Sequence, residues 1–330
     1  REIESIVKYH SNQQYHLGLR KDVARSTLAK ANEVRDWHIY YELFVELVGN
    51  LKPFEQKETK NVIKLIDSTP IMLDLNQHKW AEKTQRIKGL KVHLMYDLQE
   101  KIPVYFEITG AKTSDITTAK TIKLIKGTTY VFDKGYTDYN WWNEIDNNGA
   151  FFVTRLKNKA KIKELSEVKE TNKIIGSQLI CLASKKVHHK QIVNEYYGKT
   201  LKKVVVKREG KEPLILVTND LRRSDEEIAE LYKKRWQIEL FFKWIKQNLK
   251  IKKFLGKSEN AIKTQICIAM ISFVLLRLME ELKEICVNMP LRMLEKIVGN
   301  NLFNCLKVRE YGRKKWKDPN QLQFCWAFSP

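Results

Sequence analysis

The stretch from Ser224 to Lys250 constrains the fold most, because its pattern predicts one long amphipathic helix. Ser224 is a favoured N-cap residue, and Glu227, three positions later, can complete a capping box. Acidic residues crowd the first turn and lysines the last, as the helix dipole favours, and neither Pro nor Gly interrupts the run. At about 100° per residue the apolar side chains form a stripe along one side, made of Leu231, Ile238, Phe242, Ile245 and Leu249.

Four polar residues border this stripe and share one face within roughly a 60° arc, namely Tyr232, Arg235, Glu239 and Lys246. A solvated charged face with an Arg235–Glu239 pair explains this pattern as well as a functional site does. The helix alone leaves both explanations open, so the rest of the chain has to decide between them.

The charge of the chain is strongly basic. Its 330 residues carry 60 Lys and Arg against 39 Asp and Glu, a formal net charge of +21. Such an excess favours a polyanionic partner, most simply nucleic acid. The lysines are scattered, however, and a lysine-rich genome would give the same excess. With 43% hydrophobic and 30% charged residues, the chain is typical of a globular protein with two or more structural units.

The five cysteines are odd in number, widely spread and without a Cys-x-x-Cys pair. They predict neither a zinc site nor a disulfide framework, and they suit a reducing cytoplasm. We find no signal peptide, and the most apolar run, Ile266–Leu276, is too short to span a bilayer. We therefore expect a cytoplasmic protein that makes no use of a membrane.

Residues 1–58 are predicted to be helical, and because the chain begins abruptly at Arg1 we expect this region to be truncated. Residues 59–156 alternate between β-branched runs and amphipathic segments. The predicted strands are Val62–Thr69, Val92–Tyr96, Ile102–Thr109, Thr129–Phe132 and Phe151–Thr154. The predicted helices between them are a segment through Ile125 with Asp115 as its cap, and Tyr139–Asp146.

Three strands in a meander followed by helix, strand, helix and strand are the order of a ribonuclease H-like core. We therefore predict an α/β fold in which the first strand is central and the fourth strand lies beside it. Asp67, near the end of the first strand, and Asp133, directly after the fourth, would then lie close together.

Residues 157–218 do not continue this alternation and predict a mostly β insertion, rich in lysine. We expect it to contact DNA and to be removable without unfolding the core. Residues 219–285 are predicted to complete the core with the long helix described above and a second helix at Ser258–Lys283. Residues 286–330 form a mixed, basic C-terminal region.

Three acids thus fall at positions of interest: Asp67, Asp133 and Glu239. Each alone has an ordinary explanation, because Asp67 and Asp133 could serve turns and Glu239 could only pair with Arg235. Converging carboxylates repel one another without a cation, and hard oxygen ligands suit Mg²⁺. Two such ions can activate a water or a 3′-hydroxyl for in-line attack at phosphorus. The three acids together therefore predict a metal-dependent site acting on phosphodiesters.

The motifs around these acids resemble a known family. Tyr232-x2-Arg235-x3-Glu239-x6-Lys246 is similar to the Tyr-Arg-Glu-Lys signature of one group of bacterial insertion-sequence transposases of the DDE class. The segments IDST around Asp67 and FDKGY around Asp133 resemble that family's two Asp motifs. The resemblance covers roughly residues 60–285, including a β-rich insertion before the Glu.

The resemblance implies a ribonuclease H-like transposase that moves a DNA element by cutting and pasting. Asp67, Asp133 and Glu239 would be the catalytic residues and would bind two Mg²⁺ ions, for which Mn²⁺ can substitute. Tyr232, Arg235 and Lys246 would contact the DNA end. The partners would be inverted-repeat ends and target DNA, with a homodimer assembled on the DNA.

Trp236, beside Arg235, is either a base-stacking residue or a packed core side chain. Two other functions remain open: a related Mg²⁺ nuclease that cleaves without joining, and an inactive DNA-binding relic of a transposase. The intact set of three acids argues against the relic.

Overall fold

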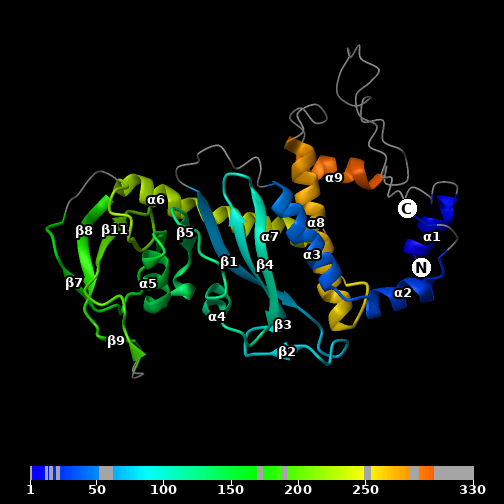
Figure 1. Ribbon diagram of the computed structural model, residues 1–330, viewed down its shortest axis with the longest axis horizontal. Helices are drawn as coiled ribbons and strands as arrows, with labels where there is room; N and C mark the ends of the chain where they lie inside the picture. The colour runs from blue at the N-terminus through cyan, green and yellow to red at the C-terminus, as the bar shows by residue number, and fades with distance from the viewer. Residues whose placement is uncertain are drawn as a thin grey trace, which may run out of the picture. The chain divides into compact units, whose positions relative to one another are not determined.

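The computed structural model describes residues 2–11, 14, 18–19, 23–51, 62–168, 174–187, 192–248, 254–281 and 290–300 (Figure 1). The chain divides into two compact units: Gly49–Lys246, and Arg1–Val48 together with Gln247–Pro330. The predicted boundary after residue 58 and most of the predicted C-terminal region lie outside the described residues, so the five-part division of the sequence stays a prediction.

The unit that contains both chain ends is helical where it is described. Its elements are α1 (Glu2–Tyr9), α2 (Arg25–Val34), α3 (His38–Leu51), α8 (Glu259–Glu281) and α9 (Leu291–Asn300). The Asn260 side chain joins α8 to the end of α2, because its Nδ2 donates to the Arg35 carbonyl at 2.7 Å. Helix α8 is long and apolar enough to cross a membrane, but 56% of that window is buried inside the protein, which is typical of a core helix.

The other unit is built on one ten-stranded mixed sheet. The order along the sheet is β2-β3-β1-β5-β6-β12-β11-β8-β7, and β4 pairs with β3. The strands are β1 (Ile63–Met72), β2 (Glu82–Lys83), β3 (Lys88–Asp97), β4 (Ile102–Gly110), β5 (Thr129–Phe132), β6 (Phe151–Arg155), β7 (Ile162–Glu164), β8 (Ile174–Leu182), β11 (Thr200–Val206) and β12 (Leu214–Thr218). A separate two-stranded sheet consists of β9 (Lys186–Val187) and β10 (Ile192–Val193).

The predicted ribonuclease H-like strand order is confirmed. Strand β1 pairs antiparallel with β3 on one side and parallel with β5 on the other. The last pair between β1 and β5 is Ile66 with Phe132, so Asp67 and Asp133 are the next residues on two neighbouring parallel strands. Because side chains alternate between the faces of a sheet, both acids leave the sheet on the same face.

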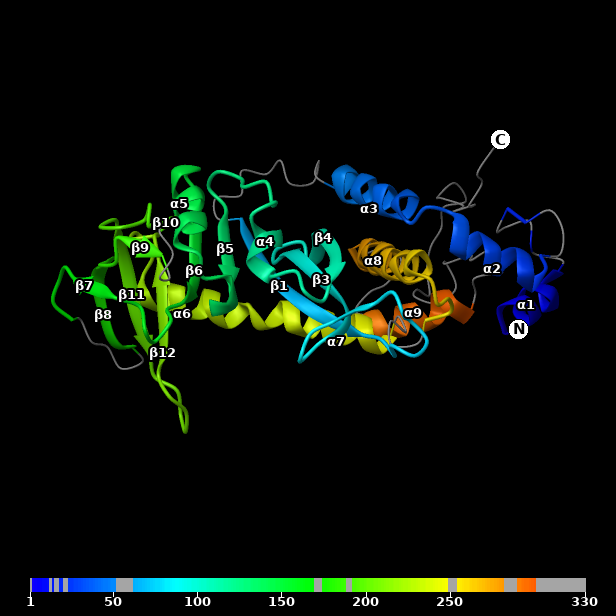
Figure 2. The same cartoon turned by 90° about the horizontal axis from the view of Figure 1, so that it is seen from below.

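Helices cover both faces of this sheet (Figure 2). On one face lie α4 (Asp115–Ala119), the short 3-10 turn Lys134–Tyr136 and α5 (Tyr139–Asn147). On the other face lie α6 (Asp225–Lys234) and α7 (Trp236–Asn248). The Asp67 side chain lies on this second face, where it contacts Arg235 between α6 and α7.

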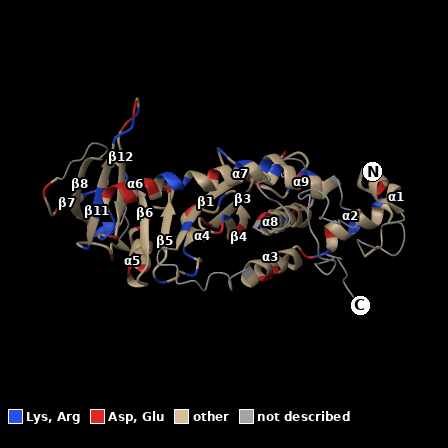
Figure 3. Cartoon of the chain, turned by 90° about the horizontal axis from the view of Figure 1, so that it is seen from above, with Lys and Arg blue, Asp and Glu red and all other residues tan. Residues whose placement is uncertain are grey.

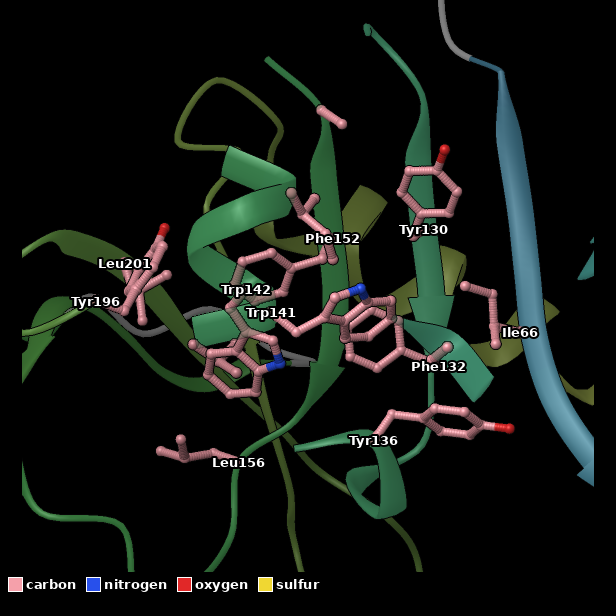
Figure 4. Packing of buried hydrophobic residues seen from close by; sticks show 14 of the residues in the cluster. Ile66, Tyr130, Phe132, Tyr136, Trp141, Trp142, Phe152, Leu156, Tyr196 and Leu201 are labelled. Atoms are coloured by element: carbon pink, nitrogen blue, oxygen red, sulfur yellow. The ribbon is translucent and has the colours of Figure 1, made fainter. Parts of the chain in front are cut away.

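The main core lies between the sheet and α5, where Trp141 and Trp142 are fully buried against Phe132 and Phe152 (Figure 4). The insertion belongs to the same core. Strand β12 pairs directly with β6, and the insertion contributes the buried residues Ile180, Leu182, Tyr196, Leu201 and Val217 to this cluster. Removal of the insertion would expose both the edge of β6 and one wall of the cluster, which argues against the expectation that the core folds without it.

The predicted long helix is interrupted. The capping box at Ser224 and Glu227 is present, and acids fill the first turn of α6 while lysines end it (Figure 3). At Arg235, however, the chain tightens into an i to i−3 hydrogen bond from its amide to the Tyr232 carbonyl at 3.1 Å. Helix α6 ends there and α7 begins at Trp236. The prediction missed the break because Arg235 keeps helical dihedral angles and no Gly or Pro marks it.

Helix α4 also differs from its prediction. It is five residues long and ends at Ala119, well before Ile125. Its N-cap is Ser114, whose hydroxyl accepts a hydrogen bond from the Thr117 amide at 3.3 Å. Asp115, which was predicted to be the cap, is instead the first helical residue, and its carboxylate is available for other partners.

A buried ion pair lies near the start of β1. Lys64 donates to the Asp97 carboxylate, and both side chains are almost fully buried. The same carboxylate accepts hydrogen bonds from the Gln99 and Glu100 amides in the turn that follows β3. The pair therefore joins β1, β3 and this turn, and its charges are compensated where water does not reach them.

Candidate active site

Three elements deliver the three predicted acids to one region. Asp67 comes from β1, Asp133 follows β5, and Glu239 projects from the first turn of α7. The Asp67 side chain is 19% exposed and that of Glu239 is 35% exposed, so both are partly removed from water. A carboxylate in this position needs a cation or hydrogen-bond donors to compensate its charge.

Arg235 supplies that compensation. Its Nη1 lies 3.2 Å from Asp67 Oδ2, and its Nη2 lies 2.5 Å from Glu239 Oε1. The Arg235 side chain is only 15% exposed, so its guanidinium bridges the two acids where little water reaches. The simple interpretation, a solvated pair between Arg235 and Glu239 on an exposed face, accounts for only one of these two contacts.

Tyr232 faces the third acid. Its side chain is buried, and its hydroxyl lies 3.5 Å from Asp133 Oδ1. Its ring also packs near the Arg235 guanidinium, at 5.6 Å from the ring centroid. Burial raises the pKa of the Tyr232 hydroxyl to about 12, and the nearby Asp133 carboxylate acts in the same direction. The hydroxyl therefore stays protonated at neutral pH and can donate to Asp133.

The remaining two predicted residues lie on α7. Lys246 Nζ donates to Thr69 Oγ1 at 2.6 Å and to the Pro70 carbonyl at 2.9 Å, which ties α7 to β1 just beyond Asp67. Trp236 is 59% exposed, so the alternative that it is a packed core side chain is wrong. An exposed indole next to Arg235 is open to a stacking partner.

The electrostatics of the acid cluster show how closely its members interact. Burial raises the pKa of Asp67 to about 6, and the Glu239 and Asp133 carboxylates raise it further, whereas the Ser68 amide and Arg235 lower it. Three carboxylates that repel one another electrostatically in a half-buried site favour a bound cation.

The donor set suits a divalent metal in its chemistry, since all three predicted ligands offer carboxylate oxygens. Within the part of the chain that the structure describes, no three His, Cys, Asp or Glu residues are grouped closely enough to hold a metal ion. Arg235 pairs with Asp67 and Glu239, while Asp133 contacts Tyr232. Metal ligation by the three acids therefore requires Arg235 to give up its carboxylate partners.

Sequence reasoning missed a second polar group behind Asp67, on the opposite face of the sheet. Its members are Ser68, Lys91, His93, Thr109 and Asp115. The only signal in the sequence was the position of Ser68 beside Asp67, because the other members come from β3, β4 and α4. Their contacts are described below.

Comparison of the sequence with known proteins identifies the family to which the chain belongs. Residues 58–275 match the family model of the transposase DDE domain, a segment that includes all seven predicted site residues. The chain is 39% identical over 282 residues to "Putative transposase y4zB" of Sinorhizobium fredii, covering 84% of this chain and 76% of the relative.

Two further relatives carry the names of insertion-sequence transposases. "Putative transposase for insertion sequence element IS4SA" of Synechocystis is 27% identical, over 86% of this chain and 78% of the relative. "Probable transposase for insertion sequence element IS5377" of Geobacillus stearothermophilus is 26% identical, over 65% of this chain and 56% of the relative. Because the family match spans residues 58–275, well over half of the 330 residues, the chain belongs to the family of transposases that carry a DDE domain.

Proposed function

We propose that this transposase cleaves the ends of an insertion sequence and joins the freed 3′-hydroxyls to target DNA in a cut-and-paste reaction. The observation that carries the proposal is the convergence of Asp67, Asp133 and Glu239 from two neighbouring strands and a facing helix. The excess of positive charge over the whole chain supports DNA as the partner.

Asp67, Asp133 and Glu239 are the proposed metal ligands, and the proposed cofactor is a pair of Mg²⁺ ions that Mn²⁺ can replace. When bound, such ions lower the pKa of an attacking water and stabilise the leaving oxygen at phosphorus. The protein's own part is to fix the carboxylates. Tyr232 donates toward Asp133, and the Ser68 amide donates to Asp67 Oδ1 at 2.8 Å.

The proposed DNA contacts surround the acids. Arg235 and Lys246 are the cations next to the site, and each would exchange a protein partner for a phosphate oxygen when DNA arrives. Trp236 would stack on an unpaired base at the DNA end. Tyr232 is buried, so its proposed contribution to holding the DNA end acts through Asp133 and Arg235.

We further propose that two copies assemble on a pair of DNA ends, because both ends of an element have to be cut and joined together. Action on bacterial DNA agrees with the cytoplasmic location expected from the cysteines. Membership of the Tyr-Arg-Glu-Lys group rests on the four residues Tyr232, Arg235, Glu239 and Lys246.

The test replaces each acid by its amide. Asp67→Asn, Asp133→Asn and Glu239→Gln should each abolish cleavage of an end-containing duplex in Mg²⁺, because an amide is a poor ligand for a hard cation. Binding of the same DNA should stay nearly intact or improve, since a negative charge near phosphate is lost. Cleavage is followed on labelled DNA and binding by gel shift.

Glu230→Gln is the matched control, because Glu230 is 55% exposed on α6 and pairs only with Lys233 among the described salt bridges. It should cleave like the parent protein. An active Glu239→Gln protein would falsify the catalytic assignment. Strand-transfer products separate the proposal from a nuclease that cuts without joining, and a parent protein that binds but never cuts in Mg²⁺ or Mn²⁺ would indicate an inactive relic.

A further inference from the structure

A hydrogen-bonded cluster lies directly behind Asp67, on the face of the sheet opposite α7. Ser68 Oγ donates to Asp115 Oδ1 at 2.8 Å, which joins β1 to α4. Lys91 Nζ, from β3, donates to the same carboxylate oxygen at 3.2 Å and to the Thr113 carbonyl at 2.7 Å. Asp115 is therefore the point at which β1, β3 and the start of α4 are fastened together.

Local structure makes Asp115 available for this task. Ser114 caps α4, so the Asp115 carboxylate is not used to satisfy the amides of its own helix. Lys91 is 13% exposed and compensates the charge of Asp115, which is 31% exposed. Lys91 from β3 and the Ser68 hydroxyl from β1 thus both donate to the same Asp115 carboxylate oxygen.

His93 completes the cluster without supplying a charge. Its Nε2 lies 2.8 Å from Thr109 Oγ1, and its Nδ1 lies 3.7 Å from Asp115 Oδ1. Burial lowers the pKa of the His93 imidazole and Lys91 lowers it further, while Asp115 and Glu107 act in the opposite direction. The neutral His93 ring therefore packs beside Asp115, and Lys91 is the cation that pairs with the Asp115 carboxylate.

The cluster is connected to Asp67 through a single residue. The Ser68 amide donates to Asp67 Oδ1 at 2.8 Å, while the Ser68 hydroxyl donates to Asp115. Both donors belong to one residue, so the hydroxyl anchors Ser68 to α4 while its amide holds the Asp67 carboxylate. The other Asp67 oxygen contacts Arg235, which the proposed function requires to leave. The Ser68 amide then remains as the described contact that orients Asp67.

We infer that Asp115 is a positioning residue for catalysis, which acts through Ser68 to hold Asp67 in the orientation that binds the metal ion. This inference rests on the proposed function, in which Asp67 is a ligand. Partners behind a metal ligand typically contribute 10- to 100-fold to metal affinity or activity. The cause is that a carboxylate free to rotate spends little time in the ligating orientation.

The first test removes the contact from each side. Ser68→Ala and Asp115→Ala should each lower the rate of single-turnover cleavage at saturating DNA by about 10- to 100-fold, with the Kd for DNA unchanged. Calorimetric titration of the DNA-free protein with Mn²⁺ should show an affinity weakened by a similar factor. Ser68→Thr retains the hydroxyl and should recover most of the lost rate.

The second test asks whether the two residues act as one unit. The double variant Ser68→Ala/Asp115→Ala should lose no more than the worse single variant, because both substitutions break the same link. Ser114→Ala is the control, since it removes the cap of α4 but leaves the bond between Ser68 and Asp115. It should cleave and bind Mn²⁺ like the parent. If Asp115→Ala does not fold, Ser68→Ala tests the link by itself, because it removes the donor of the same hydrogen bond.

Parent-like Mn²⁺ affinity and cleavage in Ser68→Ala would overturn the inference. So would an equal loss in Ser114→Ala, because stability of α4 alone would then explain the effect. Failure of the proposed function has a different signature: Asp67→Asn would still cleave. An inactive Asp67→Asn protein beside a fully active Ser68→Ala protein would reject only the positioning role.

Discussion

Asp67 holds its negative charge at a cost to the stability of the fold. Burial and the neighbouring carboxylates Glu239 and Asp133 raise its pKa from 3.8 to about 6. Between these two values the folded state binds a proton that the unfolded chain has released. The free energy of unfolding therefore falls as the pH rises through this window.

Asp67→Asn should remove this penalty. In a metal chelator the variant should be more stable than the parent above the folded pKa of about 6, by about 2–3 kcal/mol. Below the unfolded value of 3.8 the two proteins should be equally stable, because both are then uncharged at this position. Urea unfolding at a pH on either side of the window measures the difference.

Asp74→Asn serves as the control, because Asp74 is exposed and an amide oxygen can still accept its hydrogen bond from the Asn76 amide. It should show no such pH-dependent gain. An Asp67→Asn protein that is less stable than the parent at neutral pH would mean that the ion pair with Arg235 outweighs the burial of the charge.

Helix α7 brings Lys246 to the site, and the Lys246 side chain anchors this helix on β1. The Nζ contacts to Thr69 and Pro70 place the ammonium just beyond Asp67. Since a phosphate contact adds to the salt dependence of binding, Lys246 offers a direct test of the proposed phosphate contact.

Lys246→Ala should weaken DNA binding and reduce the slope of log Kd against log salt by about one. The matched control is Lys126→Ala, because Lys126 is exposed ahead of β5, at the end of that strand opposite Asp133. The control should keep the parent slope. If both variants keep it, Lys246 only anchors α7 and does not touch phosphate.

The elements differed in how well the sequence predicted them. Strand β5 was predicted with its observed bounds, because four buried apolar or β-branched residues end at a charged one. The break before Trp236 left no sequence signal, because Arg235 keeps helical dihedral angles and no Gly or Pro marks it. The bond from Ser68 to Asp115 joins residues 47 positions apart, and no local pattern encodes such a contact.

At the scale of the whole catalytic unit, the insertion and the core form one structure. The sheet continues from β6 into β12 and β11, and α6 packs against strands of both regions. The sequence predicted a mostly β insertion, but it could not reveal that the strands of this insertion extend the central sheet. Register and strand order depend on contacts between distant segments.

Leu201→Ala should therefore destabilise the core as well as the insertion. Leu201 on β11 is fully buried in the shared cluster, so the change should cost about 2–5 kcal/mol. Hydrogen exchange should show a similar loss of protection in β5 and in β11, because the two regions unfold together.

Leu165→Ala is the control, because Leu165 is 45% exposed and its truncation should lower the free energy of unfolding only slightly. Protection lost in β11 and β8 but kept in β5 would show that the insertion unfolds as an independent part, contrary to the shared core.

The buried pair of Lys64 and Asp97 favours one register between β1 and β3 over its neighbours. In the observed register Lys64 lies opposite Asp97, and Asp67 lies opposite Leu94. A slip of one residue between β1 and β3 would leave Lys64 opposite a different residue, with its buried charge uncompensated. The same slip would turn Asp67 to the α4 face, away from Glu239 and Arg235. A shifted strand pairing that removes Asp67 from the site therefore also leaves Lys64, three residues earlier, with an unpaired buried charge that destabilises the shifted register.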